Sequence, residues 1–310
     1  MGRLVLGVAL SIAALMGTSP LAQSAEGPVM ARITVGSQPG SVAFGDASVW
    51  VKNLGDQTVS RIAPATNEVT ATVRIGRGSF GYLTVGKGAV WVTNNDANTV
   101  SRIDPATNKV VATIRVGTNP QGIAVGSGSV WVANQRAQSV FRIDPRTNTV
   151  TARIPVQGAP QAVARSPGAI WVALVDSPAG GAVVRINPGT NSVLATILVQ
   201  APGGRFAVDQ RSVWITRGDS PVVTRIDLRT NRVLARVSAG GAAFGAAAGL
   251  GAVWVVRPKD GSLMRIDPST NRATRMVRIP GARSVAVGAG SLWVTDEIRN
   301  QVVRVRPVSG

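Results

Sequence analysis

Arginine and amide side chains recur at two places relative to the seven tryptophans, and they are the residues best suited to bind a ligand. Three positions after each tryptophan the chain carries Asn53, Asn94, Asn134, Leu174, Arg217, Arg257 and Asp296. Nine or ten positions before six of the tryptophans it carries Tyr82, Gln121, Gln161, Arg205, Phe244 and Arg283. Guanidinium groups beside an aromatic ring suit a carboxylate, a phosphate or a planar anion. We therefore expect a ligand-binding site formed by Arg205, Arg217, Arg257, Arg283 and Phe244, with Asn94 and Asn134 on its amide-bearing side.

These arginines have a second explanation, because carboxylates lie close to them in the sequence. Each arginine could instead form a local ion pair and leave no donor for a ligand. The carboxylates concerned are Asp219, Asp260, Asp296 and Glu297. The sequence leaves both alternatives open.

The chain contains no histidine and no cysteine, and this removes several kinds of catalytic chemistry. Histidine acid–base catalysis, serine-histidine triads, thiol nucleophiles and ordinary zinc sites all need one of these residues. Carboxylate chemistry or an oxygen-only cation site remains, with Asp96, Asp296, Glu297, Asn94 and Asn134 as candidate ligands. Their spacing matches no motif, so we expect no metal site and no cofactor.

The tryptophans also define an internal repeat. They are spaced by 41, 40, 40, 43, 40 and 39 residues, which is the period of one four-stranded propeller blade. The third unit shows four short β-rich segments, "GIAVG", "SVWVAN", "SVFRID" and "TVTARIPV", which we label strands A to D. The pattern predicts an all-β protein, a seven-bladed β-propeller that forms one domain over residues 26–310. The D-to-A and B-to-C connections then share the face that carries the candidate site.

An arginine follows each tryptophan at a nearly constant distance. Trp131 and Arg142 are eleven residues apart, whereas Trp171 and Arg185 are fourteen apart because the intervening loop is longer. If strands B and C form a hairpin, each pair lies side by side on one face of the sheet. Guanidinium stacking on indole then stabilises the blade and is not a binding site. The segment "RIDPATN" at 102–108, repeated with variations, predicts the turn between strands C and D.

The two ends of the chain complete one blade. The last unit stops after its strand C, and "MARITVG" at 30–36 matches the strand D segment "VATIRVG" at 111–117. We expect Met30 to Val35 to close the last blade, so that its edge is not left unpaired.

Residues 1–25 have the composition of a secretory signal peptide. One arginine precedes an apolar run from Leu4 to Met16, which is too short to span a bilayer, and small residues follow. We expect a periplasmic or secreted protein without a membrane span. Arginines on strand D discourage edge-to-edge association, which favours a monomer. They are Arg74, Arg115, Arg153, Arg236 and Arg278.

The net charge of +18 suggests nucleic-acid binding as a further alternative. Only four of the 33 basic residues are lysine, however, so an arginine-rich composition explains much of the charge. Few aromatic side chains other than the repeated tryptophans are available to stack on bases. The nucleic-acid alternative is therefore limited to weak, nonspecific binding of single-stranded DNA.

The repeats "VWVTNNDANTVSRIDPATNKVVATIRVG" and "VWVANQRAQSVFRIDPRTNTVTARIPV" resemble the YVTN-type repeats of secreted bacterial propellers. They are also similar to the seven-bladed virginiamycin B lyase family. The resemblance to that family implies a lyase with histidine, glutamate and magnesium at its ligand face. This chain has no histidine, however, so it lacks the residue that would act as the acid or base. We therefore favour a binding or interaction module for an anionic small molecule or protein partner, with a lyase or hydrolase as the alternative.

Overall fold

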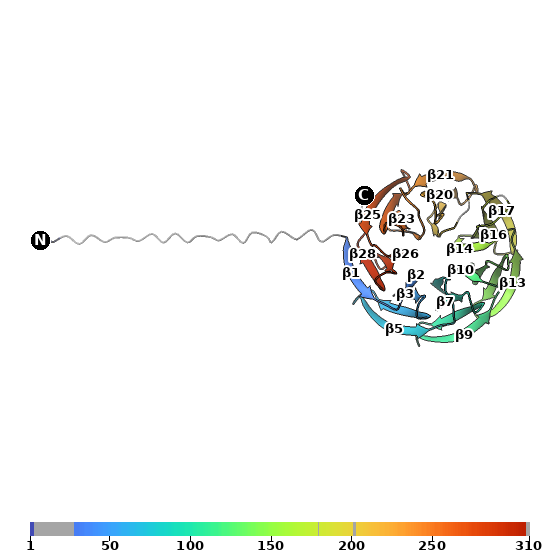
Figure 1. Cartoon of the computed structure of the whole chain (residues 1–310), viewed down its shortest axis with the longest axis horizontal. Coiled ribbons are helices and arrows are strands. Elements are labelled where there is room, and N and C mark those ends of the chain that lie inside the picture. The colour runs from blue at the N-terminus through green and yellow to red at the C-terminus, as the bar shows by residue number, and fades with distance from the viewer. Residues whose placement is uncertain (3–27, 179, 201–202, 308–310) are drawn as a thin grey trace.

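The computed structural model describes residues 1–2, 28–178, 180–200 and 203–307. Within these residues, twenty-eight strands form seven four-stranded antiparallel sheets arranged in a ring around a central axis (Figure 1). The predicted seven-bladed propeller is confirmed. Residues 3–25 of the predicted leader at 1–25 lie outside the described part.

Each blade runs from an inner strand to an outer strand, and blades 1 to 7 follow chain order. The inner strands A are β2 (Pro39–Gly45), β6 (Leu83–Gly86), β10 (Pro120–Gly126), β14 (Pro160–Ser166), β18 (Phe206–Val208), β22 (Ala246–Gly249) and β26 (Ala282–Gly288). The strands B are β3 (Ser48–Asn53), β7 (Ala89–Asn94), β11 (Ser129–Asn134), β15 (Ala169–Leu174), β19 (Ser212–Ile215), β23 (Ala252–Arg257) and β27 (Ser291–Asp296). The strands C are β4 (Thr58–Ala63), β8 (Thr99–Asp104), β12 (Ser139–Asp144), β16 (Ala182–Asn187), β20 (Val222–Asp227), β24 (Ser262–Asp267) and β28 (Gln301–Val305). The outer strands D are β5 (Glu68–Arg74), β9 (Lys109–Arg115), β13 (Thr149–Pro155), β17 (Ser192–Leu198), β21 (Val233–Ser238), β25 (Arg272–Arg278) and, for blade 7, β1 (Val29–Thr34).

Strand β1 closes the ring as the sequence predicts. It pairs antiparallel with β28, with Ile33 opposite Val302 and Arg32 opposite Val303. Ile33 is buried in a cluster with Trp293 and Val302, so the closing strand contributes apolar surface as well as backbone hydrogen bonds. The first and last segments of the domain are thereby held in one sheet.

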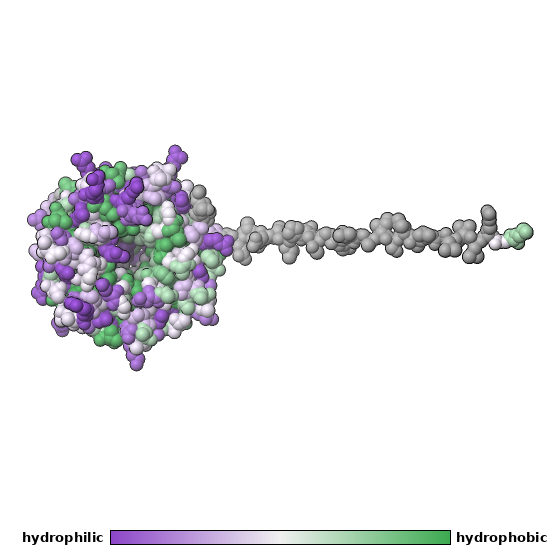
Figure 2. Space-filling view, turned by 180° about the vertical axis from the view of Figure 1, so that it is seen from behind, coloured by the Kyte–Doolittle hydropathy of each residue, from purple (hydrophilic) through white to green (hydrophobic). Residues whose placement is uncertain are grey.

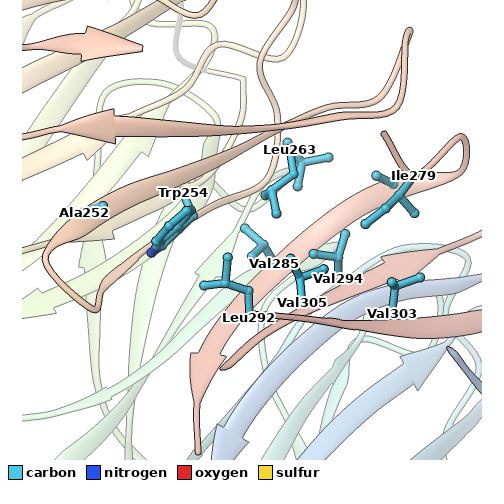
Figure 3. Close-up of a cluster of buried hydrophobic side chains, with 11 residues drawn as sticks. Ala252, Trp254, Leu263, Ile279, Val285, Leu292, Val294, Val303 and Val305 are labelled. Carbon is cyan, nitrogen blue, oxygen red and sulfur yellow. The ribbon is translucent and has the colours of Figure 1, made fainter. Parts of the chain in front are cut away.

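The core lies between neighbouring blades, where all seven tryptophans are fully buried. Trp254 of blade 6, for example, belongs to a cluster that contains Leu292 and Val294 of blade 7 (Figure 3). Strands B such as β11 are covered on both faces, which explains why apolar residues stand side by side in "SVWVAN". Strands C such as β12, "SVFRID", also carry a half-buried arginine and aspartate. Figure 2 shows hydrophilic and hydrophobic residues interspersed over one face of the ring.

The predicted tryptophan–arginine pairs are present in every blade. Trp131 lies opposite Arg142, and Trp171 lies opposite Arg185 despite the longer hairpin. The Arg142 guanidinium carbon is 5.2 Å from the centroid of the Trp131 ring. These pairs therefore belong to the framework of the blade and not to the ligand face.

Six of these seven arginines also join their blade to the next one. Arg142 donates to the Pro188 carbonyl at 2.8 Å and to Oδ1 of Asn191 at 3.0 Å, both in the C-to-D turn of the following blade. Asn191 has a φ of 59°, a left-handed conformation that asparagine tolerates better than most residues. The same arginine–asparagine bond links Arg61 to Asn108, Arg102 to Asn148, Arg142 to Asn191, Arg185 to Asn231, Arg225 to Asn271 and Arg304 to Asn67.

Blade 6 departs from this pattern for a topological reason. Its arginine, Arg265, faces blade 7, where strands C and D come from opposite ends of the chain and no C-to-D turn exists. Arg265 pairs instead with Asp267 of its own strand at 3.7 Å. In the described part of the chain, no helix is long and apolar enough to cross a membrane.

Candidate ligand-binding cavity

A cavity of about 670 Å³ opens on the face formed by the D-to-A connections and the B-to-C hairpins. Amide side chains from blades 2 to 4 make up much of its wall: Asn95, Asn98, Asn119, Gln121, Gln135 and Gln161. Aromatic and charged residues complete the wall: Phe80, Tyr82, Phe244, Asp96, Arg136 and Arg283. Apolar ring faces and convergent polar groups are the usual lining of a small-molecule site.

Arg205 lies between two of the cavity's aromatic rings. Its guanidinium carbon is 3.2 Å from the ring centroid of Tyr82 and 4.8 Å from that of Phe244. Arg283 approaches the same Phe244 ring at 5.3 Å. The stack joins blades 2, 5, 6 and 7, so it brings together residues from opposite sides of the ring.

The backbone around Thr216 of blade 5 positions Arg205 and Phe244. The Thr216 hydroxyl accepts from the Arg205 amide at 2.8 Å and donates to the Phe244 carbonyl at 2.5 Å. One side chain thus sets the start of two neighbouring inner strands. Gly204 lies so close to this hydroxyl that a Cβ atom there would be 2.0 Å from it, which explains the glycine.

The Arg205 guanidinium retains donors for a ligand. Among the described residues, its one hydrogen bond is to the Gly204 carbonyl at 3.5 Å. Burial lowers the pKa of Arg205 to about 10, so the group is still charged at neutral pH. Arg283 differs, because it pairs with Glu297 at 3.1 Å.

The other two predicted arginines are engaged in local ion pairs. Arg217 pairs with Asp219 at 2.9 Å and also approaches Gln200. Arg257 pairs with Asp260 and donates to the Ala239 carbonyl at 2.9 Å. Of the four predicted arginines, Arg283 is the one among the described residues that line the cavity, and Arg205 adjoins the cavity through the rings of Tyr82 and Phe244. The four arginines therefore divide into two that meet at Phe244 and two that stabilise their own hairpins.

Asn94 and Asn134 lie at the ends of β7 and β11 and are fully buried. The Asn94 amide donates to the hydroxyls of Thr99 and Ser101 on the next strand, at 3.0 and 2.8 Å. The Asn134 amide donates to the carbonyls of Val132 and Ser139. The structure thus places both side chains inside their hairpins, and neighbouring amides such as Asn95 and Gln121 line the cavity in their place.

A buried lysine supports the cavity wall and was not anticipated from the sequence. Lys52 on β3 is fully buried, and its Nζ donates to the carbonyls of Phe80 at 2.6 Å and Thr93 at 2.7 Å. Burial lowers its pKa to about 7, although the nearby Asp96 carboxylate opposes this shift. The available signal was its position two residues after a tryptophan, where the other blades carry threonine, alanine or valine.

Lys52 and Asp96 together fix the segment that carries Phe80. Asp96 accepts from the backbone and hydroxyl of Ser79 at 2.9 and 2.6 Å. The Ser79 hydroxyl is the main reason that the pKa of Asp96 lies below its usual value. The carboxylate is therefore ionised and gives this side of the cavity a negative charge. Within the described residues, no group of three or more acidic side chains is placed to hold a metal ion.

Sequence comparison gives one match to a family model. Residues 48–175 match a repeat of unknown function, DUF6923. No curated protein matches the chain in sequence. The YVTN-type assignment stays a prediction.

Solved propellers share the fold across nearly the whole chain. Virginiamycin B lyase from Staphylococcus aureus is 16% identical, with a TM-score of 0.78 over 90% of this chain and 99% of that one. Kuenenia stuttgartiensis hydrazine synthase is 15% identical, with a TM-score of 0.76 over 89% and 97%. The Neurospora crassa Pan2 WD40 domain is 14% identical, with a TM-score of 0.73 over 88% and 90%. At such identities the likeness establishes a shared β-propeller fold and not a shared activity.

Proposed function

We propose that this protein is an exported binding module that holds a small anionic ligand with a planar apolar part in the cavity beside Arg205. The observation that carries the proposal is the position of Arg205, a charged group with unused donors between Tyr82 and Phe244. Its export rests on the leader-like composition of residues 1–25.

The charges around the cavity suggest an orientation for the ligand. Arg205 offers positive charge on the side of Phe244, because the nearby Arg283 is paired with Glu297, whereas Asp96 is negative on the side of blade 2. An anionic group is expected beside Arg205, and a neutral polar part beside the amides of blades 2 to 4. The exposed Phe80 ring and the Phe244 ring then offer apolar contact to the planar part.

Benzoate is a suitable probe, because it combines a carboxylate with a flat ring, and benzamide is its neutral counterpart. Titration calorimetry should show benzoate binding more tightly than benzamide. Arg205→Met keeps an apolar side chain between the two rings but removes the charge. Loss of a charged hydrogen bond should weaken benzoate binding by about tenfold to a hundredfold.

Arg217→Met is the matched control, because it removes an arginine that pairs with Asp219 in its own hairpin, whereas Arg205 stacks on the rings of the cavity wall. Its benzoate affinity should equal that of the unaltered protein. Equal binding of benzoate and benzamide, or undiminished benzoate binding by Arg205→Met, would show that the proposal is wrong.

A further inference from the structure

The outer strand of blade 4 differs from the other six outer strands. Strand β17 lies at the rim of the ring and contains no charged residue in "SVLATIL" (Figure 1). Each of the other outer strands carries at least one arginine: Arg32, Arg74, Arg115, Arg153, Arg236 and Arg278. Charge on an edge strand opposes its pairing with another chain, so blade 4 lacks this protection.

The difference is sharpest at Leu198, the last residue of β17. Leu198 lies opposite Ala182, the first residue of strand C in its blade. The equivalent positions of the other blades hold Arg74, Arg115, Pro155, Ser238, Arg278 and Thr34. Four of these six are arginine or proline, which both hinder edge pairing, whereas Leu198 is 60% exposed.

Two more apolar side chains of β17 face solvent. Leu194 is 53% exposed and Val193 is 42% exposed, while Ile197 packs into the core beside blade 5. The sheet order β14-β15-β16-β17 leaves the outer edge of β17 without a partner strand in the described part of the chain. The strand therefore combines an open backbone edge with exposed leucines and high β-propensity.

We propose that two copies of this chain associate through their β17 strands, which pair antiparallel about a twofold axis. Antiparallel pairing of a strand with itself is self-complementary and closes as a dimer. Pairing centred on Thr196 brings the exposed Leu198 of each copy close to Leu194 of the other.

Charge makes β17 the most favourable of the outer strands for pairing with a second copy. With a net charge of +18, two copies repel each other, and every other outer strand would place arginines against arginines. Only β17 joins the two rings without such a contact. The proposal differs from the monomer expected from the sequence, because that expectation rested on the arginines of the other blades.

Sedimentation equilibrium of the purified protein tests the proposal. At about 100 μM, where an interface of micromolar affinity is largely occupied, the mass should be twice that of one chain. Leu198→Arg installs the residue that blades 1, 2 and 6 carry and should give a monomer with an unchanged melting temperature. Leu234→Arg on β21 alters a leucine that is 51% exposed in another blade, and should remain a dimer.

A cysteine cross-link tests the geometry independently, since the chain has no cysteine of its own. Thr196→Cys should form a disulfide-linked dimer under mild oxidation. Thr113→Cys occupies the equivalent position of β9, and should cross-link at least about tenfold more slowly, because the two sites differ only in their edges. A monomeric unaltered protein, a dimeric Leu198→Arg variant, or equal cross-linking at both positions would overturn the proposal.

Discussion

The guanidinium of Arg205 stacks on the ring of Tyr82 at 3.2 Å, although the two residues come from blades 5 and 2. Phe244 lies on the same guanidinium at 4.8 Å. The stack connects opposite sides of the ring at the ligand face. It therefore contributes both to the rigidity of the ring and to the charge of the cavity.

Replacing Tyr82 should measure the first of these contributions, the stability that the stack gives to the ring. Tyr82→Leu removes the aromatic face, and we expect it to lower the free energy of unfolding by about 0.5 to 2 kcal/mol. Tyr82→Phe keeps the ring and should be close to the unaltered protein. Urea unfolding followed by tryptophan fluorescence measures both, and equal losses in the two variants would contradict the stacking explanation.

The ionisation of Lys52 should make stability depend on pH. Its pKa is about 7 in the folded protein and 10.5 in the unfolded chain, so the unfolded state binds more protons between these values. The cost of charging the buried amine is complete below pH 7 and disappears as the pH rises towards 10.5. The free energy of unfolding should therefore rise above pH 7, by up to about 1.4 kcal/mol per pH unit.

Lys52→Met should remove this contribution to the slope of the free energy of unfolding against pH. Lys109→Met is the matched control, because Lys109 is exposed on β9 and should leave the slope unchanged. Denaturant unfolding at pH 7, 8 and 9 measures the effect. An identical slope in Lys52→Met would show that the lysine is not the titrating group.

The asparagine of the C-to-D turn should stabilise the protein in two ways, as a hydrogen-bond acceptor and as a residue that tolerates a left-handed backbone. Asn191→Gly keeps the left-handed turn but removes the acceptor of Arg142, and we expect a loss of about 1 kcal/mol. Asn191→Ala removes the acceptor and also strains the backbone, so it should lose about 1 kcal/mol more. Thermal unfolding measures both losses, and an Asn191→Gly variant as stable as the unaltered protein would contradict the contribution of the acceptor.

The closing strand should be essential to the domain. Deletion of residues 26–36 removes β1 and leaves β28 as an open edge, so we expect aggregation and a lower melting temperature. Ile33→Asp tests the same strand without a deletion, and should cost about 3 kcal/mol because Ile33 is buried. Met30→Asp is the control, since Met30 is exposed. A truncated protein that melts like the whole domain would contradict closure.

Nucleic-acid binding remains an alternative that salt can test. Nonspecific binding through a net charge of +18 should fall steeply as salt increases from about 50 to 200 mM. Fluorescence anisotropy with a labelled oligothymidylate measures this. Binding driven by the whole surface should be unaffected by Arg205→Met, whereas a marked loss would place the strand in the cavity.

Much of the fold follows from local pattern. The 40-residue spacing, the Trp131–Arg142 pair and the match between residues 30–36 and 111–117 predict blades, hairpins and closure correctly. These features depend on contacts within one blade or between equivalent strands. A repeated sequence reports such contacts once per repeat, so they can be recognised without coordinates.

The candidate site was only partly predictable, because it depends on contacts between blades. Counting from the tryptophans identifies Arg205, Phe244 and Arg283. It does not distinguish them from Arg217 and Arg257, which form ion pairs with Asp219 and Asp260. It also directs attention to Asn94 and Asn134, which point into their hairpins, and it misses Lys52.

The sequence by itself determined the number of blades, their strand order and the strand that closes them, because periodicity and register are local properties of the chain. Only the tertiary structure decided which loop residues meet. Closing seven blades into a ring brings Tyr82 to Arg205 and buries Lys52 beneath Phe80. Those contacts depend on the ring's geometry, which no single repeat contains.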